Sequence, residues 1–68
     1  MTIVFNKGFY KLSAVKKAIK AYKNLAKFGT KEEKNKIKVE LSKIDKDVKN
    51  IIKDEFSNYV LAEMKNEH

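Results

Sequence analysis

The sequence has 68 residues and a net charge of +7, with 16 basic residues, all of them lysine, and it contains neither cysteine nor proline. A chain of this length forms one domain, residues 1–68, whose core is thin because only about 60% of the unfolded surface becomes buried. The lack of cysteine excludes disulfides and thiolate metal sites, and the single histidine, His68, is too little for a zinc site or for the base of a Ser or Cys nucleophile.

The first predicted element is a strand at residues 2–6. Its core, Ile3, Val4 and Phe5, is β-branched and aromatic, and the polar residues and glycine that follow form a turn. Because no proline and at most one nearby lysine protect this strand, we expect it to form an open sheet edge that pairs with a second copy or with an extended peptide.

A helix is predicted next, with Ser13 as the N-cap and Gly29 just beyond its C-terminal end. At a period of 3.6 residues, one side of it is apolar. The members of that side are Ala14, Val15, Ala18, Ile19, Tyr22, Leu25, Ala26 and Phe28. We expect residues 30–35 to form a polar loop after this helix.

The third and fourth predicted elements are a strand and a second helix. Apolar and polar residues alternate over residues 36–42, which is the pattern of a strand with one exposed face. Asp45 or Asp47 can cap a helix that continues to about Lys65. Its apolar stripe consists of Val48, Ile51, Ile52, Phe56, Tyr59 and Val60.

These elements predict an α+β fold in the order strand, helix, strand, helix. The two strands can pair in parallel through a right-handed crossover, with both helices on one face of a short sheet. A two-stranded sheet would have two open edges, so we expect that a homodimer could extend it.

The segment FNKGFYKLSAVKKA, residues 5–18, is followed by the alternating strand and by FSNYVL at residues 56–61. In this arrangement the chain resembles the small D-type protein of the His-Xaa-Ser peptide-modification system. The resemblance covers nearly the whole chain and implies an accessory protein that acts beside radical-SAM maturases. It offers no catalytic motif to transfer to residues of this chain.

The basic residues are concentrated at the start of the chain. Residues 1–31 contain eight lysines and no acidic residue, whereas residues 32–68 contain eight lysines and all nine acidic residues. A stripe of four lysines lies opposite the apolar side of the first helix: Lys16, Lys20, Lys23 and Lys27. Neighbouring lysines in this stripe are three or four residues apart, and each such pair of like charges is unfavourable by about 0.2–0.5 kcal/mol. The residues of this predicted anion-binding face are Lys11, Ser13, Lys16, Lys17, Lys20, Lys23 and Lys27.

The lysine face has three interpretations. It could bind the phosphates of a nucleic acid without sequence preference, with the free amides after Ser13 assisting. It could be only a solvated helix face. The chain has no arginine, which makes most bidentate phosphate contacts, and the sequence shows no obvious surface aromatic residue on which bases could stack. A helix lying on a membrane surface is the third, although its apolar side is needed for the core.

Two residues of the second helix depart from its pattern. Glu55 falls on the apolar side, where a carboxylate either reaches water or a lysine, or makes a buried polar contact with Tyr22 or a partner chain. Leu61 projects from the opposite side and is a candidate contact residue.

We therefore expect a non-enzymatic adaptor that recognises a protein or peptide. The alternative is a sequence-indifferent nucleic-acid-binding protein that uses the lysine face. No apolar run approaches the roughly 18 residues of a membrane helix, so we expect a cytoplasmic protein without a membrane partner, cofactor or metal.

Overall fold

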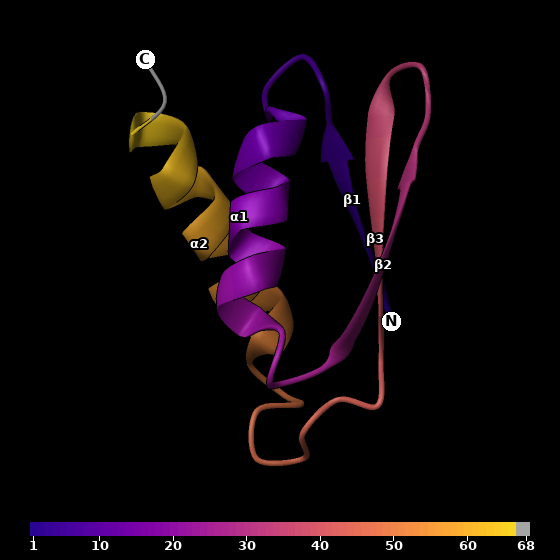
Figure 1. Ribbon diagram of the computed structural model, residues 1–68, viewed down its shortest axis with the longest axis vertical. Helices are drawn as coiled ribbons and strands as arrows, with labels where there is room; N and C mark the ends of the chain where they lie inside the picture. Colours follow the sequence, from indigo (N-terminus) through magenta and orange to yellow (C-terminus); the bar gives the residue numbers. More distant parts are fainter. Residues whose placement is uncertain (67–68) are drawn as a thin grey trace.

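The computed structural model describes residues 1–66 and contains two helices and a three-stranded antiparallel sheet. Both helices lie on the same side of the sheet, which Figure 1 shows nearly edge-on. This confirms the α+β class and the placement of both helices on one face. The elements are β1 (Thr2–Asn6), α1 (Leu12–Tyr22), β2 (Lys27–Glu32), β3 (Lys36–Ser42) and α2 (Ile52–Asn66).

The two predicted strands are confirmed over their full lengths as β1 and β3. Burial alternates along both, as a sheet with one covered face requires. In β1 the side chains of Ile3 and Phe5 are buried, and in β3 every second residue is buried. The outer face of the sheet carries no helix in the described part of the chain (Figure 1).

The predicted parallel pairing was wrong. The strand order is β1-β3-β2, and β3 pairs antiparallel with both neighbours. As a result β1 and β2 point in the same direction but are separated by β3, which is a split β-α-β unit. The sequence pattern identified the helical connection between two strands but missed the strand to which it leads.

The missing strand comes from the second half of the predicted first helix and the predicted polar loop. α1 ends at Tyr22, whose carbonyl accepts a hydrogen bond from Leu25 N at 2.9 Å. Gly29 is not a helix C-terminal residue but lies in β2, opposite Glu40. The loop shrinks to residues 33–35 and is closed by a 2.8 Å hydrogen bond from Glu33 N to the carbonyl of Lys36.

The start of each helix also differs from the prediction. Lys11, rather than Ser13, is the N-cap of α1, and no side chain caps this helix. α2 begins at Ile52, several residues after the two predicted capping aspartates. The side chain of Asp45 instead accepts a hydrogen bond from Asp47 N at 2.9 Å, which fixes a turn before the helix.

Phe56 of α2 is the centre of the core. It is fully buried, and its ring contacts the rings of Phe5, Tyr22 and Phe28 at centroid distances of 6.1, 5.7 and 5.3 Å. These contacts join α2 to β1, α1 and β2. The buried set is Ile3, Phe5, Ala14, Val15, Ala18, Ala26, Ile37, Val39, Leu41, Ile52, Phe56 and Val60.

Candidate protein-interaction site

β1 is an edge strand with one side of its backbone open. Met1 N donates to the carbonyl of Leu41 at 3.1 Å, and Leu41 N donates to the carbonyl of Met1 at 2.8 Å. Because hydrogen-bonded pairs recur at every second residue of an antiparallel ladder, Ile3 and Phe5 also direct their backbone groups towards β3. The amides and carbonyls of Thr2 and Val4, and the amide of Asn6, therefore point away from the sheet. Within residues 1–66 no hydrogen bond reaches these five groups.

The predicted edge contact consists of Ile3, Val4 and Phe5, and their side chains lie on opposite faces of the sheet. Ile3 and Phe5 are only 4% and 3% exposed, so they belong to the core and cannot meet a partner directly. Val4 is 52% exposed on the outer face of the sheet. The backbone groups of Thr2 and Asn6 complete the site, although neither residue was predicted to belong to it. The alternation of the strand was the signal that could have indicated them.

The topology leaves a place for one more strand beside β1. In the split unit formed by β1, α1 and β2, the strand β3 lies between two parallel strands. A second unit of this kind, starting from β3 and α2, would place its last strand on the open edge of β1, as in the pattern β-α-β-β-α-β. Within residues 1–66 no strand follows α2. The open edge is therefore the one position of this layout that the described chain does not fill.

The second sheet edge, β2, is less suited to strand addition. Its six residues include Lys27, Lys31 and Glu32, and charged side chains on an edge discourage pairing. Lys31 also lies directly opposite Lys38 of β3, a like-charge arrangement that is eased by the 3.4 Å ion pair between Lys38 and Glu33. β1 carries no charged side chain, so the two edges differ in chemistry.

The lysines predicted to form one helical stripe lie on different elements. Lys16 and Lys20 are exposed on α1, Lys23 is its C-cap, and Lys27 is the first residue of β2. Lys11, Ser13 and Lys17 are exposed at the start of α1, but Ser13 does not cap it. The stripe of four on a single helix was wrong because the helix ends one turn earlier.

Glu55 and Leu61 are both exposed on α2. The backbone carbonyl of Glu55 accepts a 3.3 Å hydrogen bond from the hydroxyl of Tyr22. The predicted buried contact of the Glu55 carboxylate is wrong, because this side chain is exposed to solvent. Leu61 is 47% exposed. Ile51 and Tyr59, predicted for the apolar stripe, are also exposed.

Among residues 1–66 no group of His, Cys, Asp and Glu is arranged to hold a metal ion. None of the described helices has the length and hydropathy needed to cross a membrane. His68 lies outside the described residues. Comparison with protein-family models, curated proteins and solved structures found no match for this chain.

Lys7 and Glu32 form a 2.7 Å ion pair that ties the end of β1 to β2. The hydrogen bond from Lys7, and then its charge, hold the pKa of Glu32 below its ordinary value. The pair thus contributes stability above the ordinary pKa of Glu32, and this contribution is lost as the pH falls through the lowered pKa. We expect Lys7→Met to return the pKa of Glu32 towards its ordinary value, measured by NMR titration of the carboxyl carbon. Lys38→Met is the control, because Lys38 pairs with Glu33. If this variant shifted the pKa of Glu32 as much as Lys7→Met does, Lys7 would not be the cause of the lowered pKa.

Proposed function

We propose that this protein is a non-enzymatic adaptor that binds an extended protein or peptide segment along β1. The single observation that supports the proposal is the row of outward amides and carbonyls on an uncharged edge strand. Strand addition of this kind obtains affinity from main-chain hydrogen bonds and specificity from the alternating side chains. The resemblance to small D-type accessory proteins supports a partner that is a peptide-modifying enzyme or its peptide.

Charge distinguishes such a segment from a second copy of the chain. The first 31 residues, to which β1 belongs, carry eight lysines and no acidic residue. Each copy carries a net charge of +7, and like charges disfavour the association of two copies through β1. A segment with neutral or acidic residues avoids the repulsion. The proposal therefore names a partner strand without net positive charge.

The nucleic-acid alternative has weaker support. Of the four lysines predicted to form one stripe, only Lys16, Lys20 and Lys23 remain in or at the end of α1. The outer face of the sheet has no aromatic side chain among its strand residues. Proteins that bind single strands on a sheet stack bases on such aromatic residues. Phe9 is a strongly exposed aromatic residue, at 75%, but it lies in the turn after β1 and not on the face of the sheet.

The proposal is tested with Val4→Pro, which removes one outward amide and places a ring in the path of the incoming strand. Proline is tolerated on edge strands where its nitrogen faces solvent, so the fold should survive. Peptides selected from a displayed library on the wild-type protein serve as probes. We expect the affinity of β1-binding peptides to fall by about 10- to 100-fold, because the partner keeps an unpaired carbonyl.

Thr30→Pro is the matched control, since the amide of Thr30 faces the open side of β2 by the same alternation. Thermal unfolding of both variants checks that each is folded. Unchanged peptide binding by Val4→Pro, or an equal loss in Thr30→Pro, would refute the proposal. If the wild type yields no peptides and sediments as a dimer that Val4→Pro dissociates, the edge serves a second copy instead.

A further inference from the structure

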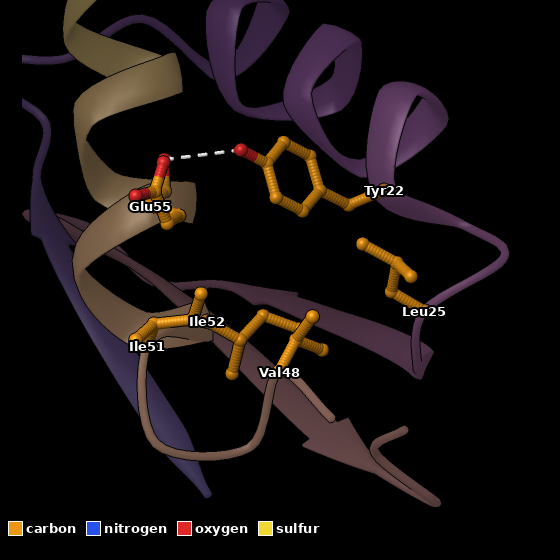
Figure 2. A pocket seen from close by; sticks show the side chains of 6 residues that line it. All are labelled: Tyr22, Leu25, Val48, Ile51, Ile52 and Glu55. Atoms are coloured by element: carbon orange, nitrogen blue, oxygen red, sulfur yellow. Dashed lines mark hydrogen bonds between the residues drawn. The ribbon is translucent and has the colours of Figure 1, made fainter. Parts of the chain in front are cut away.

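A small apolar pocket lies between the end of α1 and the start of α2, on the helical side of the molecule. Its volume is about 180 Å³. It is lined by Tyr22, Leu25, Val48, Ile51, Ile52 and Glu55 (Figure 2). Four of the six side chains are aliphatic, and the polar groups are the hydroxyl of Tyr22 and the carboxylate of Glu55. The pocket does not involve β1, so it is separate from the proposed peptide edge.

Backbone hydrogen bonds hold the walls of this pocket in place. Asp45 N donates to the carbonyl of Leu25 at 2.8 Å, which joins the segment before α2 to the segment after α1. Ile52 N donates to the carbonyl of Val48 at 2.8 Å. The Tyr22 hydroxyl bonds the carbonyl of Glu55, as the dashed line in Figure 2 marks. A binding site whose walls are already fixed loses little entropy when a ligand enters.

The charged residue in the lining of the pocket is an acid, Glu55, whereas the chain as a whole is basic. Within residues 1–66, no lysine forms an ion pair with Glu55, although lysine is abundant. Glu55 and Tyr22 both line the pocket (Figure 2), and the pKa of Tyr22 is raised by burial and then by the negative charge of Glu55. A ligand cation at this rim would meet an uncompensated carboxylate.

The size of the pocket limits the apolar part of its ligand. An apolar protein cavity of about 150 Å³ holds benzene, whereas sites for drug-sized molecules begin at about 300 Å³. The lining therefore suits one benzene-sized body and little more. We propose that this pocket binds a small organic ammonium ion, with its apolar body against Leu25, Val48 and Ile52 and its charge beside Glu55.

Three probes of one shape test the proposal: phenethylammonium, 2-phenylethanol and 3-phenylpropionate. Binding is followed by NMR through the methyl signals of Leu25, Val48 and Ile52. We expect phenethylammonium to bind about three- to fivefold more tightly than the alcohol, which is the effect of one exposed charge pair, and the carboxylate to bind least. Equal affinities for the ammonium ion and the alcohol would overturn the proposal, as would the absence of any methyl shift.

Two variants separate the charge from the apolar lining. Glu55→Gln should abolish the preference for the ammonium ion while the alcohol binds as before. Asp54→Asn removes a neighbouring charge from the first turn of the same helix and should leave the preference intact. Val48→Phe should fill the pocket and weaken all three probes. A preference that survives in Glu55→Gln, or disappears in Asp54→Asn, would contradict the role of Glu55.

Discussion

Replacing Phe56 with alanine should destabilise the protein by about 3–5 kcal/mol. The ring is fully buried and touches Phe5, Tyr22 and Phe28, so its removal leaves a cavity bordered by three elements at once. A core in a domain of this size rarely supplies more than about 3–5 kcal/mol in total. The variant is therefore expected to be largely unfolded in buffer, as measured by circular dichroism and urea denaturation.

Leu61→Ala is the control for this experiment, because Leu61 lies on the same helix but is 47% exposed. It should change stability by no more than about 0.5 kcal/mol. If Phe56→Ala unfolds at nearly the same urea concentration as the wild type, Phe56 is not the residue that joins α2 to the sheet and to α1.

Enlarging Ala18 should be the second most damaging change. Ala14, Val15 and Ala18 form the buried side of α1, and the two alanines have no exposed surface. There is no room for additional methyl groups, so Ala18→Leu should destabilise the protein by about 1–3 kcal/mol through displaced neighbours. Chemical denaturation measures the difference.

Ala21→Leu provides the comparison for that variant. Ala21 is exposed on the same helix, so the same substitution there changes helix propensity equally but meets no packed neighbour. Its effect should stay within about 0.5 kcal/mol. Equal losses of stability in both variants would indicate that a change in helix propensity, and not crowding in the core, causes the loss in Ala18→Leu.

The sequence predicted β1 and β3 correctly because each has a clear period of two. Ile37, Val39 and Leu41 alternate with polar residues, and they lie on the side of the sheet that the two helices cover (Figure 1). β2 has no comparable signal. Phe28 is its main apolar contact, and the rest of the strand is exposed. A strand at the edge of a small sheet needs few buried residues, so its own sequence resembles a loop.

The end of α1 could not be read from the sequence either. Leu25, Ala26 and Phe28 continue the helical apolar period past Tyr22, and no proline or glycine interrupts it there. In the folded protein these residues still face the core, but from a turn and a strand. Over so few residues, side chains directed at the core fit the helical period of 3.6 as well as the strand period of 2. Only the hydrogen bonds that β2 makes with the free side of β3 distinguish the two.

The candidate site was predictable in outline. An unprotected edge at residues 3–5 followed from the composition of the strand, and the structure places β1 at an edge. The sequence could not separate the buried side chains of Ile3 and Phe5 from the outward backbone of their neighbours. That distinction depends on which residues pair with β3. The pocket was missed because Leu25 and Val48 come from two segments that only tertiary packing brings together.

The split arrangement of the sheet also has a consequence for the order of folding. The β2–β3 hairpin closes across a three-residue turn, and pairs such as Glu32 with Ile37 are near neighbours in sequence. β1 pairs Thr2 with Glu40 and Asn6 with Lys36, so it must close a loop that contains all of α1 and β2. Loop-closure entropy opposes such distant pairs until local structure has formed. β1 should therefore join the sheet last, and the strand that offers the open edge is also the one whose amides should exchange first when the protein opens.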